Sequence, residues 1–187
     1  MQLQDGQTVM GTGTVVVQSA SGTTASWTAP AVGATLTSPL FTNALAPAVS
    51  MANNSTLAGV TINMNGLGDV QGVVATNVTG ATISGNTISV STLSGLASAV
   101  VLNNSTATVI NNSLSTLSDG MLDVGTAALQ INAGTSTVSR NWFFANVSVT
   151  GGTVNSGLGV NWTISGTCYA TGAITGTILL GEGATCP

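Results

Sequence analysis

Charged residues are almost missing from this chain of 187 residues, where they make up only 3% of the composition. One basic residue, Arg140, stands against five acidic residues, and there is no lysine. Nucleic-acid-binding proteins neutralise several phosphates with lysine and arginine, and anionic membrane surfaces attract basic clusters in the same way. The composition therefore excludes nucleic acid as a partner and argues against an anionic membrane surface.

Histidine is absent as well. Without histidine the chain has neither a Ser-His-Asp nor a Cys-His catalytic arrangement. Its two cysteines are too few for a zinc site. We expect no catalytic residue, no metal ligand set and no cofactor, and so a protein that is not an enzyme.

The acidic residues offer the remaining route to chemistry. Asp119 and Asp123 fall in one predicted loop, and Asp69 falls in the equivalent loop two coils earlier. General acid–base catalysis and calcium binding both need carboxylates held close together. We expect solvated loop aspartates, and a weak calcium site or a catalytic cluster remain open alternatives.

Long apolar runs are missing too. No stretch reaches the length of a transmembrane helix, and the residues after Met1 lack the basic start and apolar run of a secretory signal. We expect a mature or excised part of a longer protein. Hydrophobic residues still make up 43% of the chain, which is ample for a narrow, continuous core.

What the chain does contain is a repeat. Similar segments begin at residues 55, 81, 107, 136 and 162, so the step between them is constant except for one longer step. Repeats with a period of about 20–50 residues indicate stacked units that bury their apolar faces only against one another. The extra residues of the longer step are expected in a loop, where insertions leave the stacked positions intact.

Equivalent positions of the repeats form columns of one residue type. The expected core columns are Leu57, Ile83, Val109, Val138, Ile164 and, further along each repeat, Ile62, Ile88, Leu114, Phe143, Tyr169. An outward threonine ladder precedes the first column: Thr56, Thr82, Thr108, Thr137, Thr163. A bend with an asparagine and glycine ladder follows it: Gly59, Gly85, Asn86, Asn111, Asn112, Asn141, Gly166.

These columns predict strands. Neighbouring residues of a strand point to opposite faces, and glycine and asparagine tolerate the positive φ of a bend. Arg140 departs from the bend column and is expected to be strained or turned differently. A third apolar column is predicted at Val74, Val100 and Leu129, so that each unit contains three short strands.

The fold prediction is an all-β parallel solenoid of about five to seven coils, in a single domain over residues 1–187. Residues 1–50 are predicted to form N-terminal coils and a cap, 51–169 the regular coils, and 170–187 a C-terminal cap. Leu36 and Val15 are interpreted as upstream members of the first core column, at a shorter but constant spacing.

The two cysteines, Cys168 and Cys186, fall near the C-terminus. A disulfide between them would clip the cap onto the last coil and stabilise the fold by roughly 3 kcal/mol in the chain-entropy model. It would also favour an oxidising compartment. Two separate buried thiols are the alternative.

The columns resemble those of right-handed parallel β-helix proteins of the pectate-lyase-like superfamily. The matching residues are the asparagine ladder, the glycine and asparagine bend, and the aliphatic stacks described above. The opening "LQDGQTVMGTG" and the stretch "NNSTLAGVTI" are similar to bacterial surface β-helix proteins, including autotransporter passenger regions. The resemblance covers roughly residues 3–169 and implies a right-handed β-helix at the bacterial cell surface or outside the cell.

We therefore expect a non-catalytic structural or adhesive module, with a glycan, a host or cell surface, or a second copy as partner. A carbohydrate-active enzyme is one alternative, and an ice-binding solenoid with an outward threonine ladder is another. Trp142 and Trp162 are assigned to different columns of the repeat. Their expected role is either contact with a carbohydrate or capping of the open end of the solenoid.

Overall fold

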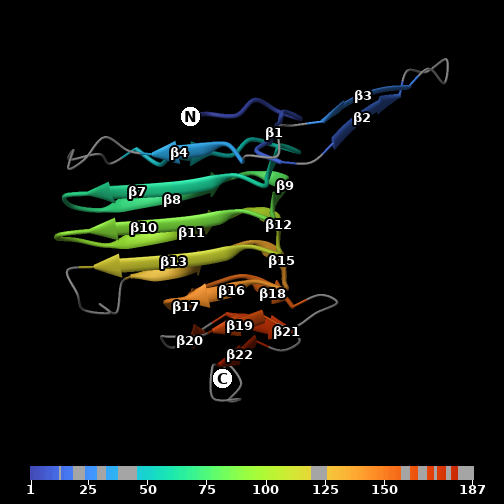
Figure 1. The fold of residues 1–187 in the computed structure, drawn as a ribbon. Helices are drawn as coiled ribbons and strands as arrows, with labels where there is room; N and C mark the ends of the chain where they lie inside the picture. Colours follow the sequence, from blue (N-terminus) through green and yellow to red (C-terminus); the bar gives the residue numbers. More distant parts are fainter. Residues whose placement is uncertain are drawn as a thin grey trace.

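The computed structural model describes residues 1–12, 14–18, 24–28, 33–37, 46–118, 126–156, 161–163, 168–170, 172–175 and 178–180. Within these residues the chain is all β, with no helix, and winds into a parallel β-solenoid (Figure 1). This confirms the predicted fold class. No helix among the described residues is long and apolar enough to cross a membrane.

Three parallel sheets form the walls of the solenoid. Sheet 1 contains β1 (Thr8–Met10), β6 (Thr56–Ala58), β9 (Thr79–Ser84), β12 (Thr106–Ile110), β15 (Thr135–Ser139), β18 (Thr153–Asn155) and β21 (Ala173–Thr175). Sheet 2 contains β4 (Thr35–Thr37), β7 (Thr61–Gly66), β10 (Thr87–Thr92), β13 (Ser113–Ser118), β16 (Trp142–Phe144), β19 (Asn161–Thr163) and β22 (Ile178–Leu180). Sheet 3 contains β5 (Val49–Ser50), β8 (Val70–Thr76), β11 (Ala97–Asn103), β14 (Ala127–Ile131), β17 (Asn146–Val149) and β20 (Cys168–Ala170).

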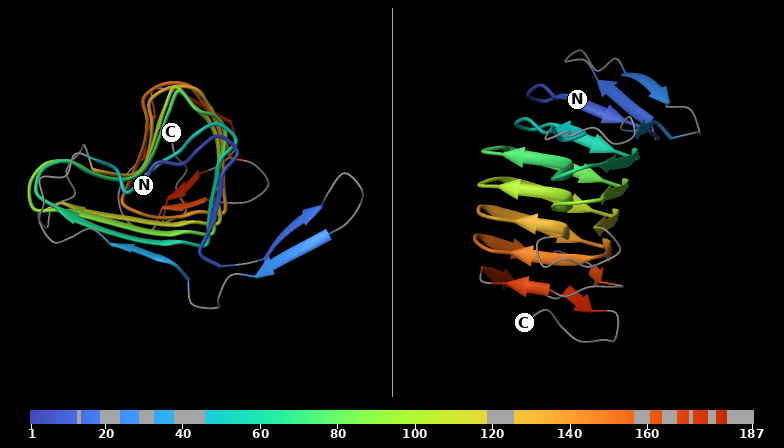
Figure 2. Two further views of the ribbon diagram at one scale, coloured as in Figure 1. Left: turned by 90° about the horizontal axis from the view of Figure 1, so that it is seen from above. Right: turned by 90° about the vertical axis from the view of Figure 1, so that its left-hand side faces the viewer.

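The regular part of the stack is about four turns, from β6 to β17, and each turn supplies one strand to each sheet. Viewed along the stack, successive coils superpose (Figure 2). This is fewer regular turns than the five to seven predicted, and the shorter strands at both ends continue the same three sheets. One further pair, β2 (Thr14–Gln18) and β3 (Thr24–Thr28), is an antiparallel hairpin that projects from the body (Figure 1).

Strands form here because threonine, valine, isoleucine and serine suit a half-buried pleated surface. In β7 the burial alternates strictly, with Ile62 and Met64 buried and Asn63 and Asn65 exposed. This is the period-two pattern of a strand with one face on a core. In β7 polar side chains therefore cover the outside of the coil, and aliphatic side chains fill the inside.

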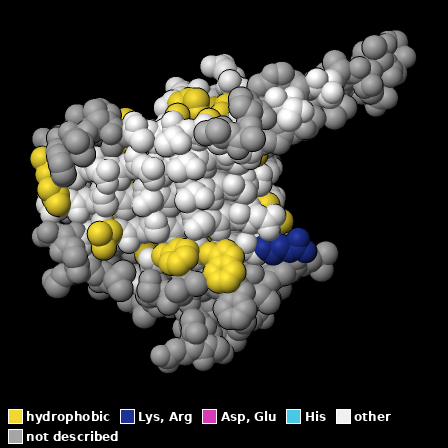
Figure 3. All heavy atoms as spheres, viewed as in Figure 1, with side chains coloured by type: hydrophobic (Ala, Val, Ile, Leu, Met, Phe, Trp, Pro, Cys, Tyr) yellow, Lys and Arg dark blue, Asp and Glu magenta, His cyan; other side chains and the backbone are white. Residues whose placement is uncertain are grey.

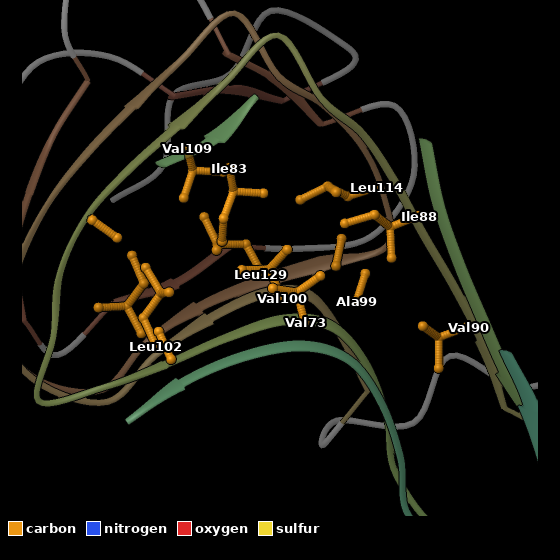
Figure 4. Packing of buried hydrophobic residues seen from close by; sticks show 14 of the residues in the cluster. Val73, Ile83, Ile88, Val90, Ala99, Val100, Leu102, Val109, Leu114 and Leu129 are labelled. Atoms are coloured by element: carbon orange, nitrogen blue, oxygen red, sulfur yellow. The ribbon is translucent and has the colours of Figure 1, made fainter. Parts of the chain in front are cut away.

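Three columns, one from each sheet, form the centre of the core, and their side chains point toward one another (Figure 4). Sheet 1 supplies Leu57, Ile83, Val109 and Val138; sheet 2 supplies Ile62, Ile88, Leu114 and Phe143; sheet 3 supplies Val73, Val100, Leu129 and Val147. Every one of these side chains is 0% exposed. Burying one such side chain stabilises a fold by about 1.5–3 kcal/mol relative to leaving it exposed.

The prediction for the fifth repeat is wrong. Thr163 aligns with Phe143 in sheet 2 instead of joining the threonine ladder, and Tyr169 aligns with Ser148 in sheet 3 instead of the second core column. The strand that follows β15 in sheet 1 is β18, where Val154 aligns with Ser136. The reason is that this coil is shorter than the coils before it. Ile164 and Gly166, the other residues assigned to this repeat, lie outside the described residues.

The predicted third apolar column, Val74, Val100 and Leu129, is wrong at Val74. Val100 aligns with Val73 of the preceding coil, and the half-buried Val74 lies beside the column instead of in it. Counted from Val73 to Val100, the step between coils is one residue longer than the repeat step read from the sequence. The extra residue is accommodated at the next corner, where the register between β9 and β12 shifts at Thr106 and Ala107. Gly80 lies at this irregularity with a φ of 73°, a conformation that glycine adopts without strain.

The predicted upstream coils are also misplaced. Leu36 lies above Ile62 in sheet 2, and Val15 belongs to the projecting hairpin, so neither extends the first core column. The residue that does extend it is Val9, which aligns with Leu57. A hairpin interrupts the first coil between sheets 1 and 2. The even spacing of Val15, Leu36 and Leu57 in the sequence therefore does not correspond to a structural repeat.

Candidate functional site

The bend between sheets 1 and 2 is a column of left-handed residues. Gly59 and Gly85 have a φ of 63°, Asn111 has 58° and Arg140 has 56°. Arg140 therefore makes the same turn as its neighbours in the stack, contrary to the expectation of a different turn. A left-handed conformation costs a residue with a side chain roughly 1–2 kcal/mol, so the expected strain is present.

An asparagine ladder fills the inside of this bend. Asn86 and Asn112 are 1% and 0% exposed, and each accepts at its Oδ1 the backbone N–H of the residue one coil earlier. The Nδ2 of Asn112 donates to the carbonyl of Ile83 at 2.9 Å and to the Oδ1 of Asn141 at 3.0 Å. The ladder thus pairs backbone groups that the bend would leave unsatisfied in the interior.

The ladder continues to a residue that the sequence analysis missed. Asn161 is 0% exposed, its Oδ1 accepts from the Nδ2 of Asn141 at 2.9 Å, and its Nδ2 donates to the carbonyl of Val138 at 2.8 Å. The repeat alignment does not place Asn161 in the ladder, because it assumes a constant coil length. The residue type could have indicated this role of Asn161, because an asparagine side chain can both accept and donate hydrogen bonds along the stack.

The threonine ladder lies on the outer face of sheet 1. Thr56, Thr82, Thr108 and Thr137 align in register and are half-buried, and Thr8 extends the ladder at the N-terminal end. A second outward column lies two residues earlier and contains Thr106, Thr135 and Thr153. Two neighbouring coils therefore carry a complete Thr-x-Thr pattern.

The outer face of sheet 2 carries a second hydroxyl-rich array, which the sequence analysis did not single out. Its columns are Thr35, Thr61, Thr87, Ser113 and, two residues along, Thr37, Asn63, Ser89, Ser115. All of these side chains are exposed or half-buried, and none is charged. This array could have been predicted from the sequence, because small polar residues alternate with aliphatic ones in each of these strands.

In the next coil, two aromatic side chains follow the hydroxyl and amide side chains of these columns. Trp142 aligns with Ser113 and is 48% exposed, while Phe144 aligns with Ser115 and is 39% exposed. We call these two residues the aromatic pair. They lie on the same face because they are two positions apart in β16, with the fully buried Phe143 between them on the other face.

Polar and apolar side chains meet on the face that Figure 3 shows. Figure 3 shows polar side chains over most of this face and apolar ones gathered near its lower edge, beside the one basic side chain of the chain. In the next coil Trp162 aligns with Trp142, so the two tryptophans share one column of sheet 2. The prediction that they occupy different columns is wrong, and its cause is again the short coil.

The acidic residues that the structure describes serve turns. Asp69 Oδ1 accepts the backbone N–H of Leu96 at 2.9 Å, and Asp5 Oδ1 accepts that of Asn53 at 3.1 Å. Asp119 and Asp123 lie outside the described residues. Over the described part of the chain, no group of three or more histidine, cysteine or acidic side chains could hold a metal ion.

Cys168 is a buried residue of β20, 7% exposed, and aligns with Val147. Cys186 lies outside the described residues, so its pairing with Cys168 stays a prediction. We expect no free thiol after denaturation without reductant. Two titratable thiols would establish the alternative of separate cysteines.

No protein-family model, curated protein or solved structure gives a significant match to this chain. The structure therefore supplies the fold, and the candidate site is defined by the outer faces of sheets 1 and 2.

Proposed function

We propose that this chain is a non-catalytic adhesive module that holds flat, uncharged strand faces rigidly for contact with another surface. The observation that carries the proposal is the outer face of sheet 2, where in-register columns of hydroxyl and amide side chains end in the exposed aromatic pair. Exposed apolar side chains that lie together and are rimmed by polar residues mark interaction sites, whereas single scattered ones do not.

Rigidity supports this role. The buried columns and the asparagine ladder tie each coil to the next through side chains that are 0–1% exposed. Interiors packed in this way resist deformation. A face on such a scaffold loses little conformational entropy when it binds, which favours contact through many weak polar interactions.

The resemblance to right-handed β-helix proteins of the pectate-lyase-like superfamily supports a location at the bacterial cell surface or outside the cell. Autotransporter passenger regions are the group that it resembles in sequence. The aspartates that the structure describes accept backbone hydrogen bonds in turns, which is a structural use of a carboxylate. This arrangement supports the proposal that the module binds without catalysis.

The experiment is adhesion of the purified protein to surfaces coated with neutral glycans, with acidic glycans, or with the protein itself. We expect retention on at least one of them, with the glycan unchanged. Release of unsaturated or reducing oligosaccharides from pectin or alginate would instead establish a carbohydrate-active enzyme. Retention on none of the surfaces would reject adhesion.

Ice binding is the second candidate, and the register of the threonine ladder on sheet 1 favours it. The ladder presents hydroxyl and methyl groups at the strand spacing of about 4.8 Å. The test is thermal hysteresis, with Thr108→Tyr as the variant that should abolish it and Thr61→Tyr on sheet 2 as its control. Absence of hysteresis at high micromolar protein would reject this candidate.

A further inference from the structure

We infer that the aromatic pair and the serines beside it form a binding site for a neutral glycan built of hexopyranose units. The inference rests on the proposed adhesive function and assigns it a ligand class and a location. The site comprises Trp142 and Phe144 of β16 and, on the neighbouring strand, Ser113 and Ser115.

Geometry is the first argument. Trp142 and Phe144 are two positions apart on one strand, so their Cα atoms are about 7 Å apart and both side chains leave the same face. Ser113 and Ser115 lie on the neighbouring strand, whose backbone is about 4.8 Å from that of β16. The site therefore offers two aromatic surfaces in a row with a parallel row of hydroxyl groups beside it.

Chemistry is the second argument. A pyranose ring has a face of C–H groups and a rim of hydroxyls. The C–H face packs on the electron-rich face of an aromatic ring, and the rim forms hydrogen bonds with small polar side chains. An apolar peptide would use the aromatic rings but would exclude water from the adjoining hydroxyls without replacing the hydrogen bonds that water makes with them.

Charge selects among glycans. The strands of sheet 2 from β4 to β16 contain no charged residue. Arg140 is exposed two residues before Trp142, but a single exposed cation adds little affinity for an anion. An acidic glycan would therefore find almost no compensation for its charges, whereas a neutral glycan needs none.

Area argues against a second copy of the chain as the occupant. Stable protein interfaces bury about 800 Å² on each partner around an apolar centre. Here the exposed apolar side chains are Trp142, Phe144 and Leu117 of the neighbouring strand, and columns of serine, threonine and asparagine border them on the side of the preceding coils. Such a surface suits a narrow, polar ligand with apolar faces better than a protein partner.

The test is titration of the full chain with cellohexaose, maltohexaose and mannohexaose, in which binding is monitored by NMR chemical shifts. Hexagalacturonate is the acidic comparison. We expect at least one neutral oligosaccharide to bind and to shift the indole signal of Trp142. Trp142→Ala should weaken that binding about tenfold, and Trp142→Ala with Phe144→Ala should reduce it to background. Leu117→Ala is the matched control, because Leu117 is an exposed aliphatic side chain of the same face, and it should change affinity less than twofold.

The melting temperature of each variant shows whether the fold is intact, and Trp142→Phe, which keeps a ring, should retain most of the affinity. Binding of hexagalacturonate alone, or no binding of any neutral oligosaccharide at millimolar concentration, would overturn the inference. So would self-association that the double variant abolishes. If the protein adheres to glycan surfaces and the double variant adheres equally well, this site is rejected while the adhesive function stands. If the protein adheres to nothing, both fall.

Discussion

At the scale of single residues, a buried asparagine in each of four successive coils solves the problem of a sharp bend inside the fold. Asn112 forms four side-chain hydrogen bonds: it accepts two from Asn86, at 2.9 and 3.1 Å, and donates to Ile83 and Asn141. Each bond satisfies a group that water cannot reach. The residue type was foreseeable from its repetition in sequence, because stacked amides can bond along the stack.

Asn112→Ala tests this role. The substitution leaves the backbone N–H of Asn86 without a partner in the interior and removes one of the two hydrogen bonds to the carbonyl of Ile83, whose other partner is β12. We expect the free energy of unfolding in urea to fall by about 1–3 kcal/mol. Asn63→Ala, on the exposed face of sheet 2, is the control and should leave the free energy of unfolding nearly unchanged. Equal effects from both variants would show that the ladder bonds do not stabilise the fold.

Arg140 is the one residue of the left-handed bend column that is neither glycine nor asparagine. Because its φ is 56°, replacement by glycine should relieve the strain of this conformation. The added freedom of glycine in the unfolded chain offsets part of the gain, so Arg140→Gly should raise the free energy of unfolding by about 0.5–1 kcal/mol.

Arg140→Ala is the matched control, since it removes the same charge but keeps the strained backbone. Thermal unfolding should therefore show a gain for Arg140→Gly and none for Arg140→Ala. A gain of the same size in both variants would mean that the charge, and not the backbone, is responsible.

At the scale of strands, the sequence predicts well where the coil length is constant or where an insertion is confined to a loop. From β6 to β16 the repeat steps read from the sequence hold, and the columns of Leu57 and Ile62 are predicted correctly over four coils. Prediction fails where a corner changes length, because a shift of one residue moves every side chain to the opposite face. The misplaced Val74 and the misassigned fifth repeat both follow from an assumption of constant length.

The aromatic pair shows the same limit for the candidate site. Aromatic residues near the last coils are visible in the sequence, and the buried position of Phe143 follows from its column. The exposure of Trp142 follows from the neighbouring position. The shared column of Trp142 and Trp162 was not predictable, because it depends on a coil that is shorter than the others.

One inner column of sheet 2 contains a mismatch. Thr116 aligns with Val90, which in turn aligns with Met64, and its hydroxyl is buried with no hydrogen-bond partner among the described residues. Thr116→Val keeps the shape and removes the unsatisfied group. We expect the free energy of unfolding to rise by about 1 kcal/mol. Thr87→Val on the exposed column of the same sheet should have little effect, and a loss of stability in Thr116→Val would mean that the hydroxyl is bonded.

At the scale of the whole molecule, the fold is a linear stack in which each coil contacts its neighbours only. Stability in such stacks is approximately a sum of terms for single coils and for the interfaces between neighbours. Interior columns and the asparagine ladder belong to those interfaces, while the outer faces of sheets 1 and 2 stay outside them and carry the proposed contacts with other molecules. This division explains how an almost uncharged chain can combine a continuous core with surfaces covered by hydroxyl groups.

The most direct test of the stack is the set of methyl NOEs along the first core column in the labelled protein. Equivalent residues of adjacent coils lie about 4.8 Å apart, so we expect cross-peaks that connect Leu57 to Ile83, Ile83 to Val109, and Val109 to Val138. Absence of the cross-peak between Ile83 and Val109, with each methyl group contacting a different set of neighbours, would contradict the stacked coils and every functional proposal built on their faces.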